Sequence, residues 1–391
     1  MRLRSICVIF SLALVAGAAG AAGVARADTT VLDVGPDPVV QAREYVAEGN
    51  MAGAIEWLNE YVQSHPDNVR ARRFLGDLFF RTGKIDLAAS VYQAILRQDP
   101  FDKETHNRLG SVYAAENRVD DAIKQFEAAL PGTDSVGDLV ALHERKGDLP
   151  AYTAKVYAAS REYPGDSGIQ AELGQVLSAL HHDDLAIPVY ERALNDNPSD
   201  LNALNGIGLS YLALRQYDSA IDAFEKCLHV ANDVYQCQNN LGAAYLESHQ
   251  LISARVTLDR AYHLAPERGE TFVNYGYLDD ELGNWQKATG EYAKAIELYP
   301  YLREAYIDLA LDYERHGLNM LAQTVLIKGI ASVYDDGRLH VLLGQAYEAQ
   351  GNSADAVAQF RIGLKGTDPD AIAVASQQLS SIVVNPTSSP Q

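Results

Sequence analysis

The chain has 391 residues, of which 47% are hydrophobic, and its 52 acidic and 32 basic residues give a net charge of -20. This charge disfavours nucleic acid and anionic lipid as partners, because phosphate binding draws its affinity from lysine and arginine. The length alone predicts two or three globular domains, but an internal repeat overrides that expectation.

Residues 1–27 have the layout of an export signal. Arg2 and Arg4 form a basic start, residues 6–15 are strongly apolar, and Ala25-Arg26-Ala27 supplies the small residues that a signal peptidase requires before Asp28. We therefore expect a cleaved signal peptide and a periplasmic or secreted protein.

An uncleaved membrane anchor is the alternative for the same segment. No charge interrupts residues 5–25, a run long enough to span a bilayer. A membrane is expected as a partner only in that case. Residues 28–34 are expected to form a short linker.

The stretch 201–232 reads as two amphipathic helices joined by a tight turn. In its first half, Leu204, Ile207 and Tyr211 follow the three- and four-residue spacing of a helix with one buried stripe. Gly208 and Ala220 are small residues that let two helix backbones approach closely. One such hairpin has too small a core to be stable alone, so it needs copies stacked against it.

The same skeleton recurs every 34 residues from residue 35 onwards. The small residue of the first helix recurs at Ala42, Gly76, Gly110, Gly174, Gly208, Gly242, Gly276, Ala310 and Gly344. The alanine of the second helix recurs at Ala54, Ala88, Ala122, Ala186, Ala220, Ala254, Ala288, Ala322 and Ala356. The fourth copy departs from both, with Val140 and Tyr152 at the two places.

These residues resemble the tetratricopeptide-repeat (TPR) family, in ten repeats over about residues 35–370. The resemblance implies an all-α, right-handed superhelical solenoid of paired antiparallel helices. It also implies that the first helices line a concave groove that holds peptides or protein segments. Residues 371–383 read as one more amphipathic helix that caps the array, and residues 384–391 as a disordered tail.

One irregularity suggests how the array is divided. The interval from Gly110 to Val140 is 30 residues, and Pro131-Gly132 interrupts the expected end of a helix. The enlarged side chains at residues 140 and 152 are expected to open the packing there. We expect repeats 1–3 at 35–132, a divergent repeat 4 at 133–166 that acts as a joint, and repeats 5–10 at 167–370. A local variation without mechanical consequence is the alternative.

The resemblance also points to residues that face the groove. The asparagines expected there are Asn202, Asn205, Asn239, Asn240, Asn274 and, nearer the N-terminus, Asn107. An asparagine amide offers a donor and an acceptor, so it can bind a peptide backbone whatever the side chains. The arginines expected there are Arg70, Arg73, Arg81 and Arg108, which could receive a carboxylate. Polar residues that are merely solvated are the alternative.

Chemical motifs are scarce. Cys227 and Cys237 lie almost symmetrically about the turn between repeats 6 and 7, where a disulfide and a pair of buried thiols are both open. The cluster at residues 181–184, His-His-Asp-Asp, falls in a polar turn, so we expect no metal site. No phosphate-binding loop or recognisable nucleophile occurs, and we expect neither a cofactor nor catalysis.

Together these observations favour a non-catalytic exported scaffold that binds protein or extended peptide segments, in an envelope or secretion complex. A self-assembling structural protein or one associated with a cell-wall polymer is the alternative, and an enzyme is the third. The sequence leaves the oligomeric state open.

Overall fold

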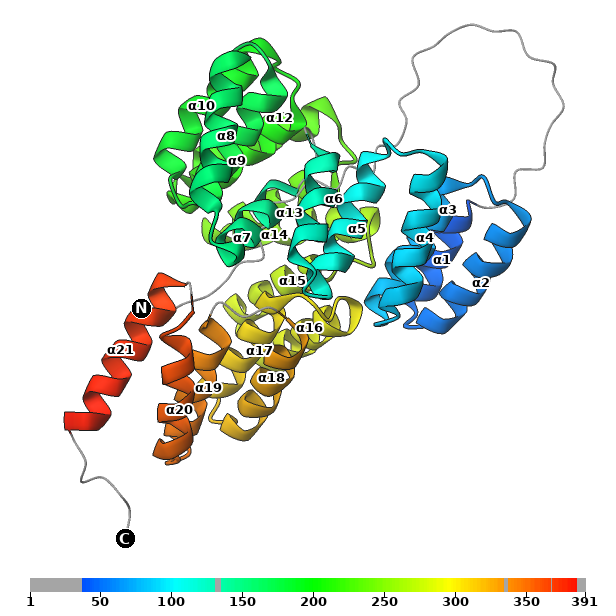
Figure 1. Ribbon diagram of the computed structural model, residues 1–391. Coiled ribbons are helices and arrows are strands. Elements are labelled where there is room, and N and C mark those ends of the chain that lie inside the picture. The colour runs from blue at the N-terminus through cyan, green and yellow to red at the C-terminus, as the bar shows by residue number, and fades with distance from the viewer. Residues whose placement is uncertain (1–36, 131–134, 334–336, 367, 385–391) are drawn as a thin grey trace, which may run out of the picture. The chain divides into compact units, whose positions relative to one another are not determined.

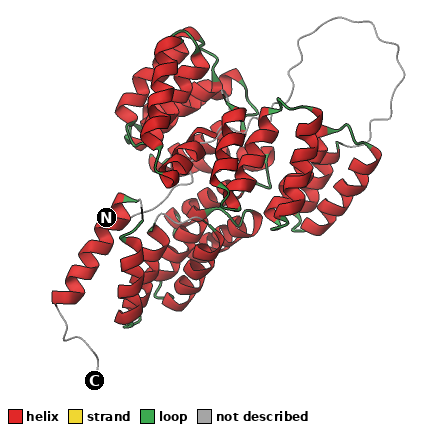
Figure 2. Ribbon diagram, viewed as in Figure 1, coloured by secondary structure: helices red, strands yellow, loops and turns green. Residues whose placement is uncertain are grey.

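The computed structural model describes residues 37–130, 135–333, 337–366 and 368–384. In these ranges the regular elements are all helices, and no strand occurs (Figure 2). The expected all-α fold is therefore confirmed. The signal peptide at 1–27, the linker at 28–34, the Pro131-Gly132 interruption and the tail from residue 385 lie outside the described residues.

The helices follow one another as antiparallel pairs, one pair for each repeat (Figure 1). The pairs are α1 (Pro38–Ala47) and α2 (Met51–Ser64), α3 (Val69–Arg81) and α4 (Ile85–Gln98), α5 (Lys103–Ala115) and α6 (Val119–Ala129), α7 (Ser135–Lys146) and α8 (Leu149–Glu162), α9 (Ser167–Ala179) and α10 (Asp183–Asp196), α11 (Leu201–Ala213) and α12 (Tyr217–Val230), α13 (Tyr235–Glu247) and α14 (Leu251–Leu264), α15 (Gly269–Glu281) and α16 (Trp285–Leu298), α17 (Arg303–Arg315) and α18 (Asn319–Ser332), and α19 (Arg338–Ala349) and α20 (Ser353–Gly363).

A further helix, α21 (Pro369–Val384), follows the tenth pair. Its Ala371 and Ala375 are buried in one cluster with Val341, Ala356 and Phe360 of the last pair. The helix thus covers apolar surface of the tenth pair, and its role as the cap that ends the array stays a prediction.

The small residue of the first helix makes room for a large one on the second. A Cβ atom placed on Gly76 would lie 2.5 Å from the ring of Tyr92, and one on Gly174 would lie 2.5 Å from Tyr190. Both rings are 1% exposed. The backbone of the first helix thus lies directly against the ring, which explains why glycine recurs at this place.

The fourth repeat satisfies the same geometry with different residues. Val140 replaces the small residue, but Val156 stands where most repeats carry a ring, and both valines are buried. Tyr152 replaces the alanine, and the smaller His143 stands where most repeats carry an aromatic residue. The His143 and Tyr152 rings stack, with centroids 4.5 Å apart. Each enlarged residue therefore faces a smaller one than in other repeats, so the packing that was expected to open is compensated.

Each pair turns through a residue in the left-handed region of backbone space. Six of the ten such positions are glycines, with Gly83 at φ 72° as an example, and four are other residues. These four are Asn117, His181, Arg215 and His249, at φ between 57° and 60°. His181 of the cluster at 181–184 thus forms the turn itself, and His182 is the residue preceding α10.

The chain divides into two compact units between Glu267 and Arg268. The N-terminal unit contains α1 to α14 and the C-terminal unit contains α15 to α21. This boundary follows the seventh repeat. The joint expected at residues 133–166 stays a prediction.

Candidate functional site

The first helices of repeats 6 and 7 carry a row of amides. Asn205 lies on α11 and Asn240 on α13, and the Asn240 side-chain amide donates a hydrogen bond to Asn205 Oδ1 at 2.9 Å. Residues on the same face of neighbouring first helices thus come together as the repeat predicts. Asn202 lies one turn before Asn205, and its buried Oδ1 accepts no hydrogen bond within the described residues.

Most of these asparagines are too deeply buried to line an open peptide groove. Asn205 is 2% exposed, and Asn239, Asn240 and Asn274 are completely buried, while Asn202 is half-buried. The resemblance to the repeat family predicts that all five face a groove. In this conformation only Asn202 offers part of its surface, so the role of the other four in binding stays a prediction.

A disulfide lies beside this row. Cys227 of α12 and Cys237 of α13 are bonded, with Cα atoms 6.3 Å apart, and both are fully buried. Of the two arrangements that the sequence left open, the structure contains the bonded one. Cys237 Sγ lies 3.9 Å from Asn205 Oδ1, so the bond fixes α13 next to the amide row.

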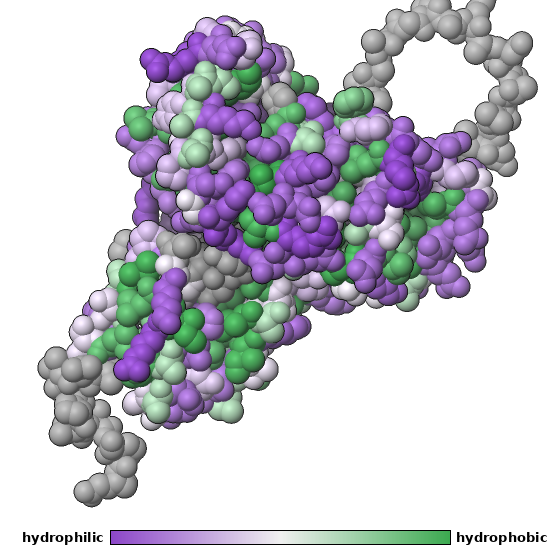
Figure 3. All heavy atoms as spheres, viewed as in Figure 1, coloured by the Kyte–Doolittle hydropathy of each residue, from purple (hydrophilic) through white to green (hydrophobic). Residues whose placement is uncertain are grey.

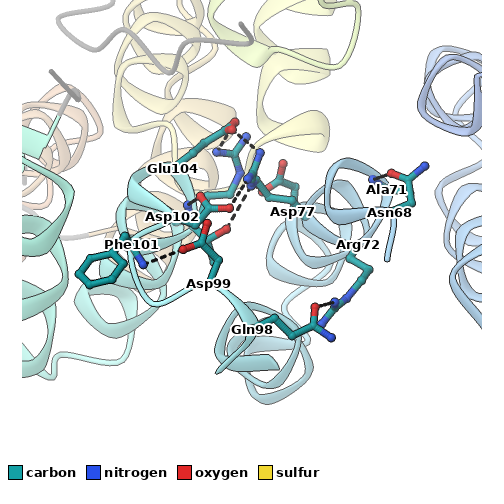
Figure 4. A network of polar contacts seen from close by, with 12 residues as sticks. Asn68, Ala71, Arg72, Asp77, Gln98, Asp99, Phe101, Asp102 and Glu104 are labelled. Carbon is teal, nitrogen blue, oxygen red and sulfur yellow. Dashed lines mark hydrogen bonds and ion pairs between the residues drawn. The ribbon is translucent and has the colours of Figure 1, made fainter. Parts of the chain in front are cut away.

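Arg73 on α3 and Arg108 on α5 are held by carboxylates of the chain itself. Arg73 contacts Asp102 at 2.6 Å and also pairs with Glu104, and Arg108 contacts Asp77 at 2.8 Å and Glu104 at 2.9 Å. Figure 4 shows the three acidic side chains turned toward one centre between the second and third repeats. Three carboxylates thus surround two guanidinium groups, and no positive charge is left over.

The pKa of Asp102 agrees with these ion pairs. Burial opposes ionisation of Asp102, yet the Thr105 backbone N–H and the Arg73 guanidinium hold the pKa of that carboxyl below its ordinary value. Charged pairs of this kind orient side chains strongly when they lie out of water. The network therefore joins two repeats. Arg73 and Arg108 are already paired within the chain, so the prediction that they receive a partner's carboxylate is wrong for this conformation.

The remaining N-terminal site residues also have partners within the chain. Arg70 is exposed and pairs with Asp37 at 2.6 Å. Arg81 is buried and donates to the backbone carbonyl of Glu267 at 2.8 Å. Asn107 Oδ1 accepts a hydrogen bond from Ser135 Oγ at 2.8 Å. Only Arg70 presents its charge to solvent.

The C-terminal unit has a buried acidic pair that lies outside the residues predicted to form a site. Asp280 on α15 and Asp312 on α17 both contact Arg315 Nη1, at 3.2 and 3.4 Å, and His316 lies 3.5 Å from Asp312. Burial and then the charge of Asp280 raise the pKa of Asp312 to about 6. A spacing of 32 residues, close to the repeat length, was the available signal that these two carboxyls meet.

Asp279 occupies a place where most other repeats carry a buried or half-buried aromatic residue. It is 1% exposed, and its Oδ2 lies 2.9 Å from Lys287 Nζ on α16. A buried charge thus replaces apolar packing between the two helices of repeat 8, with the lysine side chain compensating it.

The described part of the chain was also compared with the requirements of a metal site and of a membrane span. It holds no cluster of three or more His, Cys, Asp or Glu residues suited to a metal ion. Asp183 of the cluster at 181–184 is buried, and burial raises the pKa of its carboxyl. None of the helices in the described ranges combines the length and the hydrophobicity needed to cross a bilayer.

Comparison with known proteins gives the same repeat. A family model described as "Tetratricopeptide repeat" matches residues 39–103, 75–136, 172–232 and 307–372, which together cover more than half of the chain. The "TPR repeat-containing protein YpiA" of Bacillus subtilis (strain 168) is 25% identical over 181 residues. The match spans 44% of this chain and 42% of YpiA, so the chain covers less than half of that relative.

Solved structures with a similar trace include the APC/C hetero-tetramer Cut9-Hcn1 and yeast Tom70. The first is 12% identical with a TM-score of 0.47, covering 88% of this chain and 96% of the other. The second is 12% identical with a TM-score of 0.48, covering 90% of this chain and 96% of the other.

Proposed function

Since the chain belongs to the tetratricopeptide-repeat family, we propose that it is a non-catalytic scaffold that binds segments of partner proteins. One observation carries the choice of site: the polar first-helix face of repeat 6. There Asn202 is half-buried, and its Oδ1, which is shielded from solvent, accepts no hydrogen bond beside the bonded Asn205–Asn240 pair. An extended segment has backbone N–H groups suited to such an acceptor.

The test is a pull-down with the tagged full-length protein from extracts of its own organism. Asn202→Ala/Asn205→Ala is compared with Asn195→Ala, which removes an exposed asparagine from the second helix α10. We expect the double variant to lose most of the partners that the wild type and the control retain. Equal recovery by all three proteins would reject the site, and the absence of any reproducible partner would reject the scaffold function.

We further propose that the protein acts after export, in the assembly of an envelope or secretion complex. The signal-like residues 1–27 support export, and so does the Cys227–Cys237 disulfide, because such bonds persist in oxidising compartments. N-terminal sequencing of the protein from fractionated cells tests this proposal. A mature chain beginning at Asp28 is expected, whereas an intact leader in the membrane fraction indicates an anchor.

Self-assembly is a second candidate, favoured by the outer face of α18. Met320, Leu321 and Ile327 are 66%, 47% and 47% exposed there. Hydrophobic side chains gather on the visible face of the C-terminal unit, whereas that of the N-terminal unit is mostly hydrophilic (Figure 3). Light scattering on the wild type and on Met320→Gln/Ile327→Gln tests this candidate. A wild-type monomer at micromolar concentration would reject it.

A further inference from the structure

Two arginines near the start of the N-terminal unit reach the segment just after its last helix. Arg43 on α1 contacts Glu267 Oε1 at 3.1 Å and donates to the Leu264 carbonyl at 3.3 Å. Arg81 on α3 donates to the Glu267 carbonyl at 2.8 Å. The bonded residues are 186 to 224 positions apart in sequence, so repeats 1 and 2 lie against the end of repeat 7.

These contacts lie largely out of water. Glu267 is 8% exposed, Arg81 is 9% exposed, and the Arg43 side chain is 18% exposed. The Arg43 guanidinium also lies over the Phe74 ring, 5.7 Å from its centroid. An ion pair with so little solvent is weakly screened, and removing one partner strands the other charge.

The contacts differ in kind from those along the array. Repeats in a solenoid contact their neighbours, and stability spreads from one interface to the next. Here the first helices of repeats 1 and 2 contact the end of repeat 7, at Leu264 and Glu267. Such a contact closes the unit on itself, and it can break while every neighbour interface stays intact.

We propose that Arg43, Arg81 and Glu267 form a latch that holds the N-terminal unit closed and that opens as a discrete step. Arg43 and Arg81 are the ninth and thirteenth residues of their repeats, on the first-helix side expected to meet a partner. Opening the latch frees both guanidinium groups together with that side of α1 and α3. That opening lets a partner reach this side rests on the proposed scaffold function. The latch itself does not.

Hydrogen exchange measured by mass spectrometry on the full-length protein tests the latch. Arg43→Ala/Arg81→Ala should accelerate exchange at least about tenfold both in α1 and α3 and in the segment around 264–267, because both ends lose their buried contact together. Glu267→Gln keeps the backbone carbonyl and removes only the charge, so it should accelerate the same peptides by a smaller factor. Exchange in α9 to α12 should stay unchanged, which separates opening from global unfolding.

Arg70→Ala is the matched control, because Arg70 is exposed, lies at the opposite end of α3 from Arg81, and pairs with Asp37, the residue before α1. Its exchange near 264–267 should equal that of the wild type. Exchange confined to α1 and α3, without a change around 264–267, would overturn the latch. Unchanged exchange in both places would overturn it too. The pull-down described above tests the scaffold function by a separate readout, so either idea can fail alone.

Discussion

The imidazole of His143 lies parallel to the ring of Tyr152, with centroids 4.5 Å apart and planes 9° apart. His143 also contacts Asp148 Oδ1 through Nδ1 at 2.7 Å, which fixes the orientation of the ring. The two residues stand where other repeats pair an aromatic residue of the first helix with an alanine of the second. Repeat 4 has therefore moved aromatic volume from one helix to the other.

Restoring the usual residue types at both positions should cost less stability than changing Tyr152 alone. Tyr152→Ala alone leaves a cavity beside His143 and should cost about 3–5 kcal/mol in the free energy of unfolding. Adding His143→Tyr to that variant should recover at least about 1 kcal/mol, because the larger ring refills the space. Thermal and urea unfolding measure both effects. Tyr157→Ala, which truncates a 41% exposed tyrosine of the same helix, is the control and should change stability by about 0.5 kcal/mol at most.

The turn residue Arg215 should be improved by glycine. Its φ of 59° is costly for a residue with a Cβ atom, and six repeats use glycine at this place. Arg215→Gly is expected to raise the free energy of unfolding by about 0.5–1 kcal/mol, seen as a higher Tm. The converse change, Gly317→Ala at φ 73°, should lower stability by a similar amount. A loss of stability in Arg215→Gly would show that its side-chain contacts outweigh the strain.

Replacing a helical glycine by alanine should lower or raise stability according to whether another side chain packs against that glycine. A Cβ atom at position 174 would meet the Tyr190 ring at 2.5 Å, so Gly174→Ala should cost about 1–3 kcal/mol through overpacking. At Gly290 of α16 no atom lies within 4 Å, so Gly290→Ala should stabilise by about 0.5–1 kcal/mol through helix propensity. Thermal unfolding of the two variants should therefore move in opposite directions, and a shared direction would contradict the packing described here.

Stability should depend on pH through Asp312. Burial and then the charge of Asp280 raise its pKa from 3.8 to about 6, against the opposing charges of Arg315 and His316. The folded chain therefore binds this proton more tightly than the unfolded chain, and the contribution of Asp312 to stability falls as pH rises from about 4 to about 6.

Asp312→Asn should remove that dependence. Relative to the wild type, the variant should gain about 1–3 kcal/mol on going from pH 4.5 to pH 7, measured by chemical unfolding at both pH values. Asp222→Asn is the control, because that carboxylate is 64% exposed and pairs with Lys226 at the surface. The same pH-dependent gain in the control, or none in Asp312→Asn, would contradict a raised pKa of the buried Asp312 carboxyl.

Much of the fold follows from residue pattern alone. Small residues such as Gly76 and Gly174 mark where a ring of the paired helix presses on the backbone, and alanines mark the second contact. These contacts lie between the two helices of one repeat, so the spacing of small residues in the sequence reveals them. In repeat 4 the enlarged Tyr152 was evident, but its compensation by His143 depends on which side chains face each other in three dimensions.

The site was less predictable, because its partners come from other repeats. Arg73 and Glu104, like Asp77 and Arg108, are 31 residues apart. Opposite charges just under one repeat length apart were a usable signal that these arginines are already paired. Arg81 and Glu267 are 186 residues apart, and no sequence pattern indicates that contact. Burial of Asn240 likewise depends on what surrounds the face, not on its place in the repeat.

The Cys227–Cys237 bond joins the second helix of repeat 6 to the first helix of repeat 7. The interfaces between repeats can separate one at a time, but this covalent link keeps repeats 6 and 7 together. Partial unfolding should then stop on either side of residues 217–247, and a protease acting on partly opened chains should leave that block intact. Under reducing conditions the same boundary becomes an ordinary one, and the length of the surviving fragment reports the oxidation state of the protein.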